Sequence, residues 1–230
     1  MQNPIIVALD VSTAEEALAL ARELADTVGA FKVGKELFVS AGPDIVRAIR
    51  DTGGAVFLDL KFHDIPNTVA KAVAAAARLD VQMLTLHTSG GRDMMAAAEA
   101  EAQEADRPPL VLGVTVLTSM DGHDLDEIGL SMEPAAQVKR LAQLAHSAGL
   151  RGLVCSPREI MTVRQALPRE MQLVTPGIRP AGSDVGDQKR TLTPAEAISA
   201  GANWLVIGRP ITGAGNPRQA AENILQSLPD

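Results

Sequence analysis

Short apolar runs alternate with longer amphipathic stretches along most of the chain. Continuous apolar runs of this kind are typical of strands buried on both faces of a parallel sheet, and a repeat near 3.6 residues is typical of helices. The predicted strands are residues 5–9, 30–33, 55–60, 82–86, 110–116, 152–155, 172–174 and 204–207. The predicted helices are residues 14–25, 43–50, 67–78, 93–104, 134–148, 157–166, 194–200 and 217–228.

Eight strands, each followed by a helix, are the count of a (β/α)8 TIM barrel. A doubly wound open sheet is the structural alternative, and the lack of a Gly-x-Gly-x-x-Gly turn after the first strand weakens its dinucleotide-binding form. Ser12 is the expected N-cap of the first helix, with Glu15 at capping-box spacing. Because no linker-like segment interrupts the alternation, we expect residues 1–230 to form a single barrel domain.

Composition narrows the possible partners. The 230 residues are 46% hydrophobic and 21% charged, which is ordinary for a soluble globular protein. A net charge of −7 and 2% aromatic residues argue against binding of a nucleic-acid polymer. No apolar run approaches the roughly 20 residues of a membrane span, so we expect no membrane partner. The single cysteine excludes an intrachain disulfide. Because the first ten residues also lack the basic region of a signal peptide, we expect a cytoplasmic protein.

The functional residues of a barrel enzyme lie at the carboxyl ends of its strands. This rule selects a set of polar residues that adjoin the apolar runs. They are Asp10, Lys32, Asp59, Lys61, His87, Thr118, Cys155, Ser156, Arg179 and Arg209. For any one of them alone, a solvated strand end is the commoner interpretation, so the argument depends on groups of residues.

The third strand carries the most informative group. Asp59 and Lys61 should share one face of the strand because side chains alternate, and Asp64 follows in the turn before the next helix. A lysine between two carboxylates is a pattern that keeps an ammonium protonated in a cleft. Such an ammonium can protonate a developing carbanion. Lys32 on the neighbouring strand could complete the charge array, and a structural ion-pair cluster is the alternative.

A second group suits a phosphate. Barrel enzymes often bind phosphate with the loops after strands seven and eight, which here hold Arg179 and the pair Gly208–Arg209. Gly208 allows close backbone approach, and an arginine can bind phosphate through two hydrogen bonds. The long irregular segment 178–193 is a candidate mobile loop over the site.

Other residues give weaker signals. His63 and His87 are too isolated for metal-ligand spacing, so structural or hydrogen-bonding roles are expected and no metal site is predicted. Cys155 is expected to be a packed strand end, and Trp204 a core residue.

The segment 59–68, Asp-Leu-Lys-Phe-His-Asp-Ile-Pro-Asn-Thr, resembles the signature of the orotidine 5′-phosphate decarboxylase family. The resemblance extends over essentially the whole chain. Further matching segments are 7–10, 31–34, 117–120, 175–179, 187–190 and 207–211. It implies a cofactor-free decarboxylase that converts orotidine 5′-phosphate to UMP in the last step of de novo pyrimidine synthesis.

The resemblance also implies a role for individual residues. Lys61 matches the proton donor to C6 of the pyrimidine, Asp59 the carboxylate beside the substrate carboxylate, and Lys32 and Asp64 the rest of the charged network. The resemblance also implies a homodimer with shared sites, in which the residues that match Asp64 and Thr68 come from the partner chain. The remaining matches are ribose contacts (Asp10, Lys32), pyrimidine contacts (Thr118, Ser119) and the phosphate end (Pro176, Arg179, Gln188, Gly208, Arg209).

The chemistry agrees with these residues. Loss of CO2 from C6 leaves a vinyl-type carbanion that no Schiff base or thiamine-like electron sink can easily delocalise, so electrostatic stabilisation by Lys61 is the natural solution. One alternative is a sister enzyme that acts on sugar phosphates and holds an enediolate with Mg²⁺, such as 3-keto-gulonate-6-phosphate decarboxylase or hexulose-6-phosphate synthase. Another is a non-catalytic sensor of a phosphorylated ligand.

Overall fold

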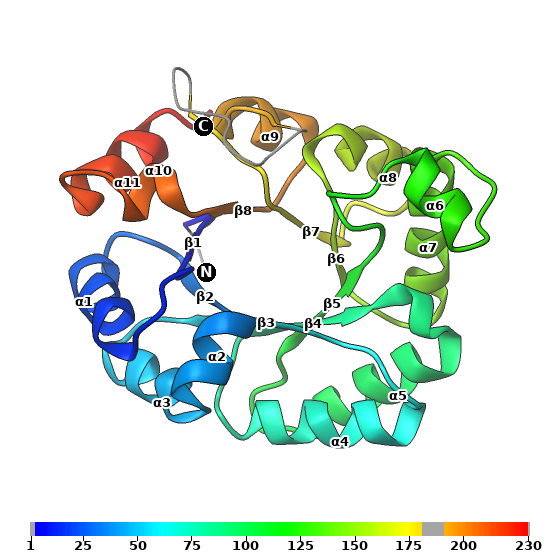
Figure 1. Cartoon of the computed structure of the whole chain (residues 1–230), viewed down its shortest axis with the longest axis horizontal. Coiled ribbons are helices and arrows are strands. Elements are labelled where there is room, and N and C mark those ends of the chain that lie inside the picture. Colours follow the sequence, from blue (N-terminus) through cyan, green and yellow to red (C-terminus); the bar gives the residue numbers. More distant parts are fainter. Residues whose placement is uncertain (1–2, 181–190, 230) are drawn as a thin grey trace.

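The computed structural model describes residues 3–180 and 191–229, and its centre is a closed parallel barrel (Figure 1). Each strand pairs with the next along the chain, and β8 pairs with β1, which confirms the predicted (β/α)8 barrel and rules out the open sheet. The strands are β1 (Ile5–Ala8), β2 (Ala30–Gly34), β3 (Val56–Phe62), β4 (Met83–His87), β5 (Leu110–Val114), β6 (Gly152–Val154), β7 (Gln172–Thr175) and β8 (Trp204–Ile207).

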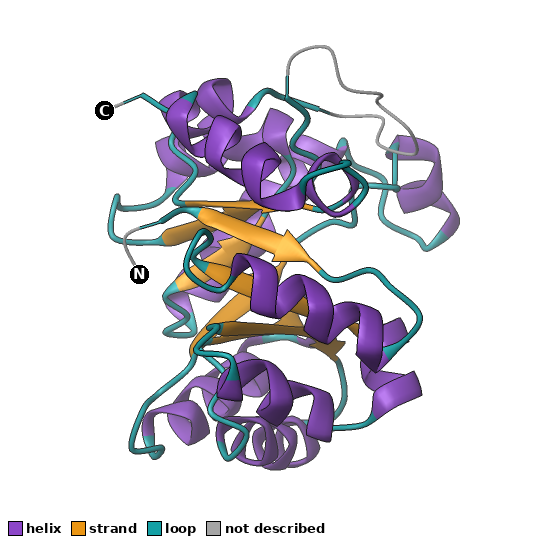
Figure 2. Cartoon of the chain, turned by 90° about the vertical axis from the view of Figure 1, so that its left-hand side faces the viewer, coloured by secondary structure: helices purple, strands orange, loops and turns teal. Residues whose placement is uncertain are grey.

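Helices form the outer layer of the barrel, as Figures 1 and 2 show from two directions. The helices are α1 (Ala14–Leu24), α2 (Lys35–Ala41), α3 (Asp44–Asp51), α4 (Pro66–Ala77), α5 (Arg92–Gln103), α6 (Gly122–Glu127), α7 (Pro134–Ser147), α8 (Ile160–Ala166), α9 (Pro194–Ala200), α10 (Arg209–Thr212) and α11 (Pro217–Gln226). Two short 3-10 helices are η1 (Thr88–Gly90) and η2 (Pro157–Glu159). In the described part of the chain, no helix has the length and apolar character needed to span a membrane.

Strand alternation divides the apolar side chains into two clusters. One fills the space between the barrel and the helices, and the other fills the barrel interior. The interior cluster consists of Ile6, Ala8, Ala30, Phe57, Met83, Leu112, Val174 and Val206. Since these side chains fill the lower interior, the polar residues farther along the same strands stand above an apolar floor.

The largest errors of the sequence prediction concern short helices and one cap. The helices α2, α6 and α10 were not expected, and β5 ends at Val114, two residues before the predicted end. The prediction of Ser12 as N-cap of α1 is wrong: Thr13 is the N-cap, and its hydroxyl accepts a hydrogen bond from the backbone N–H of Glu16. The Ser12 hydroxyl donates instead to Oε1 of Glu36, so it is occupied by α2.

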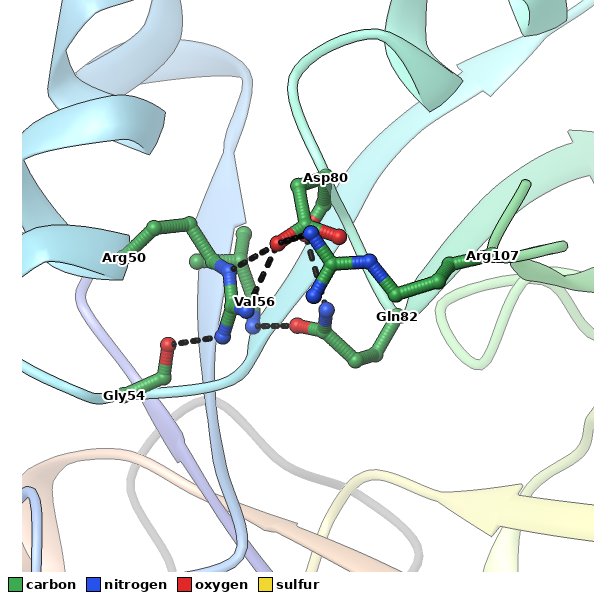
Figure 3. A network of polar contacts seen from close by, with 6 residues as sticks. All are labelled: Arg50, Gly54, Val56, Asp80, Gln82 and Arg107. Carbon is green, nitrogen blue, oxygen red and sulfur yellow. Dashed lines mark hydrogen bonds and ion pairs between the residues drawn. The ribbon is translucent and has the colours of Figure 1, made fainter. Parts of the chain in front are cut away.

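A polar network ties β3 to β4 at the amino ends of these strands (Figure 3). Arg50 at the end of α3 donates from Nη2 to Oδ2 of Asp80 at 2.7 Å and from Nη1 to the carbonyl of Gly54 at 2.7 Å. Gln82 accepts from the Val56 N–H at 2.7 Å and donates to the Asp80 carbonyl at 2.8 Å. The network therefore fixes the start of both strands, whose opposite ends carry the polar site.

Candidate active site

Two ion pairs lie at the carboxyl ends of the first three strands. Lys32 from β2 donates to Oδ1 of Asp10, which follows β1, at 2.8 Å. Lys61 from β3 donates to both carboxylate oxygens of Asp59, each at 2.8 Å. Lys32, Asp59 and Lys61 line one pocket, so the structure brings these predicted residues together.

The backbone at Lys61 is unusual. Its φ of +55° lies in the left-handed region, which non-glycine residues rarely adopt. The pairing of β3 with β4 shifts at the same place, between Leu58 and Phe62. Leu60 packs against the outer apolar cluster while Asp59 and Lys61 line the inner pocket, as alternation predicts.

The pocket above the barrel floor has a volume of about 170 Å³ and a mixed lining. Its charged residues come from β2 and β3, and the rest of the lining comes from β3, β5, β6 and β8 and from the segments that follow β5, β6 and β7. The lining residues are Lys32, Phe57, Asp59, Lys61, Val114, Val116, Leu117, Thr118, Val154, Cys155, Ser156, Pro176 and Val206. A flat, partly apolar ring with polar edges is the kind of ligand that such a lining fits.

A second pocket, of about 360 Å³, adjoins the first and shares Lys32, Pro176 and Val206 with it. Arg179 and Arg209 line it from the segments after β7 and β8, together with Gly177 and Gly208. Gly177 has a φ of +77°, which a residue with a side chain would adopt only with strain. The structure thus places both predicted phosphate-binding arginines in one cavity next to the charged pair.

Three of the predicted site residues stand apart from these pockets, and a fourth lies outside the described residues. Asp64 and Thr68 are exposed at the start of α4, and the Asp64 carboxylate accepts a hydrogen bond from the Ile65 N–H. Ser119 is exposed and lies beside, not in, the lining of the pocket. Gln188, with the rest of the segment 187–190, lies outside the described residues.

The two histidines near the site form a ring pair. The centroids of His63 and His87 lie 5.5 Å apart with the rings tilted by 46°. Burial lowers the pKa of His87, and the positive charges of His63, Lys35 and Lys61 lower it further. In the described part of the chain, no group of three or more histidine, cysteine or carboxylate side chains is placed to hold a metal ion.

Cys155 is a packed strand end, as predicted. The thiol is buried beside the pocket, and burial raises its pKa to about 12. A thiol with this pKa stays protonated near neutral pH and is a poor nucleophile. Trp204 is half-buried against the barrel interior and donates from Nε1 to Oε1 of Gln172, so it lies at the floor, away from the polar pockets.

Comparisons with known proteins show the family of the chain. A sequence model of the orotidine 5′-phosphate decarboxylase / HUMPS family matches residues 3–224. The chain belongs to this family. A relative from Pseudomonas paraeruginosa, named orotidine 5′-phosphate decarboxylase, is 56% identical over 228 residues, covering 99% of this chain and 98% of the relative. One from Opitutus terrae with the same name is 55% identical over 229 residues and covers 99% of both chains.

Solved structures of the family share the barrel. The orotidine 5′-phosphate decarboxylase from Lactobacillus acidophilus superimposes with a TM-score of 0.89 at 36% identity, over 99% of this chain and 100% of that one. The enzyme of the same name from Pyrococcus horikoshii gives a TM-score of 0.78 at 27% identity, over 96% and 97% of the two chains. The fold of the orotidine 5′-phosphate decarboxylase / HUMPS family therefore accounts for the whole described barrel.

Sequence reasoning missed two residues that shape this family site. Gly34 follows Lys32 on β2, and a Cβ there would lie 3.2 Å from Nζ of Lys32, so glycine leaves room for the Lys32–Asp10 pair. Thr85 on β4 is fully buried and hydrogen-bonds to both Asp59 and Lys61. The sequence did contain a signal for Thr85, because it lies in the predicted strand 82–86 two residues after Met83. Side chains alternate along a strand, so Thr85 shares the interior face with Met83.

Proposed function

We propose that the protein decarboxylates orotidine 5′-phosphate to UMP, without a cofactor, and that Lys61 supplies the proton to C6. The observation that carries the proposal is the Asp59–Lys61 ion pair in a pocket joined to a second one lined by Arg179 and Arg209. A ring held in the first pocket can have its ribose phosphate in the second. Family membership and the named relatives support the same carboxy-lyase reaction.

The proposed step conserves electrons and protons. The bond between C6 and the carboxylate carbon breaks, CO2 leaves, and the electron pair stays on C6. The Lys61 ammonium stabilises this charge as it develops, then forms the new C6–H bond with one of its protons. The two hydrogen bonds from Lys61 to Asp59 hold the ammonium in place before the reaction, so little reorganisation is needed.

Asp59 has a second proposed role beside the substrate carboxylate. Its charge lies next to the leaving group, where repulsion falls as CO2 departs, and Lys32, which lines the same pocket, completes the charged network. Enzymes of very slow reactions lower their barriers by up to ~23 kcal/mol, which is more than one lysine can supply. Binding energy from the phosphate must therefore contribute to catalysis at C6.

The proposed binding contacts follow the two pockets. Thr118 lies on the base side, and Ser119 beside it is proposed to reach the pyrimidine. Asp10 and Lys32 hold the ribose where the two pockets meet. At the phosphate end, the proposed contacts are Pro176, Arg179, Gln188, Gly208 and Arg209.

We further propose a homodimer with shared sites. Asp64 and Thr68 are exposed, and the neighbouring Ile65 side chain is 66% exposed, which suits a surface covered by a second chain. In that arrangement Asp64 and Thr68 reach the site of the partner subunit. The proposed location is the cytoplasm, and a chain whose single cysteine cannot form an intrachain disulfide agrees with it.

The test is direct. Purified protein at micromolar concentration is mixed with orotidine 5′-phosphate, and the ultraviolet spectrum is followed for conversion to UMP. Complete conversion in the presence of EDTA is expected. No conversion, together with tight UMP binding, would favour the non-catalytic sensor, and activity lost in EDTA and restored by Mg²⁺ would favour sugar-phosphate chemistry.

A further inference from the structure

Thr85 occupies a gap in the pairing of β3 and β4 directly beneath the charged pair. Leu58 pairs with Leu84 and Phe62 pairs with Leu86, so residues 59–61 of β3 lie opposite Thr85 alone. Extra residues on one strand form a bulge, which re-aims side chains and is common next to active sites. The two strands lie side by side in Figure 1. The bulge contains Asp59 and Lys61, which line the pocket.

The Thr85 hydroxyl makes two hydrogen bonds within this bulge. It accepts from the backbone N–H of Lys61 at 2.9 Å, and it donates to Oδ1 of Asp59 at 2.9 Å. The side chain is fully buried, so water does not compete for either bond. A hydroxyl has one proton, and here the carboxylate accepts it.

These bonds act on the two features that define the Asp59–Lys61 pair. The bond to the Lys61 N–H stabilises a backbone with a φ of +55°. This conformation costs energy, and it persists only when surrounding contacts hold it in place. The bond to Asp59 restricts the rotation of a carboxylate whose two oxygens both accept from Lys61 Nζ. One side chain thus sets the direction of the proton donor and of its carboxylate partner.

We propose that Thr85 is a positioning residue for the decarboxylation, acting through Asp59 and Lys61 without touching the substrate. The inference rests on the proposed function, since it assigns Lys61 as the proton donor. Thr85 is absent from the linings of the pocket above the barrel floor and of the adjoining arginine pocket, so its effect falls on the chemical step, with little effect on nucleotide binding.

Steady-state kinetics of T85V and T85S test the proposal. Valine keeps the branched shape and removes both hydrogen bonds, so kcat is expected to fall about tenfold to hundredfold, the range for loss of a bond to a charged group. KM and the Kd for UMP are expected to stay within about twofold of the wild-type values, because ground-state binding is untouched. T85S keeps the hydroxyl and should recover kcat to within about threefold.

A second buried threonine provides the control. Thr88 is also fully buried, and its hydroxyl donates to the Val114 carbonyl at 2.9 Å. T88V therefore removes one buried hydroxyl bond that reaches neither Asp59 nor Lys61, and it should leave kcat within about twofold of the wild type. If T88V lowers kcat as much as T85V, loss of any buried bond in this region explains the effect, and the positioning role is wrong.

Other results would also overturn the proposal. T85V with wild-type kcat, or T85S as impaired as T85V, would show that the hydroxyl is not what matters. If T85V does not fold, T85A takes its place in the same comparison. A crystal structure of T85V tests the positioning role even if the wild type proves inactive. We expect a displaced Asp59 carboxylate or a relaxed Lys61 backbone, and unchanged positions of both residues would refute the inference.

Discussion

Two arginines bind the same oxygen of Asp80, and the structure predicts that only one of them matters for stability. Arg50 donates to Oδ2 from Nε at 3.2 Å and from Nη2 at 2.7 Å, and its third bond goes to the Gly54 carbonyl. The side chains of Arg50 and Asp80 are 23% and 27% exposed. Arg107 approaches the same oxygen at 3.0 Å, but its side chain is 74% exposed (Figure 3).

The expected costs differ because of this exposure. Arg50→Ala removes three charge-assisted bonds from a largely buried site and leaves Asp80 paired only at the surface, so we expect a loss of about 2–3 kcal/mol in the free energy of unfolding. Arg107→Ala breaks an exposed ion pair, and the expected loss is about 0–1 kcal/mol. Salt should reduce the smaller effect further, because exposed charges are screened.

Urea unfolding followed by fluorescence measures both values. Trp204, the single tryptophan, lies at the barrel floor and reports on loss of the interior. The shift in midpoint, multiplied by a common slope, gives the change in free energy. Both variants should keep wild-type kcat below the transition, because the network lies at the opposite ends of β3 and β4 from the site. Equal losses for the two variants would refute the reasoning from burial.

Three further predictions concern single residues. Ellman's reagent at pH 8 should leave Cys155 essentially unlabelled in the folded protein and label it fully in urea, because burial raises the thiol pKa to about 12. Rapid labelling of the native protein would contradict this prediction. Burial and nearby positive charges lower the pKa of His87, so the unfolded state binds more protons and stability falls as pH drops below the unfolded value of about 6.5. His87→Gln should flatten that pH dependence, measured by urea unfolding at several pH values, and an unchanged slope would show that another group is responsible. Arg209→Ala should weaken UMP binding about tenfold or more while uridine binding stays unchanged, and equal losses for both ligands in calorimetry would argue against a phosphate contact.

The sequence was sufficient for the barrel because its signals are local and repeated. The helix Pro194–Ala200 was predicted with its exact bounds, since Thr193 caps it, Pro194 opens it and Gly201 ends it with a left-handed backbone. The helix Lys35–Ala41 was missed because Val39 is 83% exposed, which obscures the apolar periodicity. Its stability comes from packing of Leu37 and Phe38, a tertiary effect.

The candidate site was likewise predictable where it depends on local sequence and not where it depends on tertiary contacts. Alternation along one strand was enough to place Asp59 and Lys61 on the same face, and the strand-end rule placed Arg179 and Arg209 together. The left-handed backbone of Lys61 could not be predicted, because it depends on a register shift against β4. The hydrogen bonds of Thr85 depend on the same non-local pairing, and they emerge only when both strands are in place.

The role of Lys61 is the central claim, and single-turnover decarboxylation by Lys61→Ala tests it most directly. Loss of the proton donor and of its charge at C6 should lower the rate by at least about a thousandfold, while UMP still binds and the exposed-lysine control Lys139→Ala keeps full activity. A Lys61→Ala rate within about tenfold of the wild-type rate would contradict the account, because such a loss is too small for an essential acid.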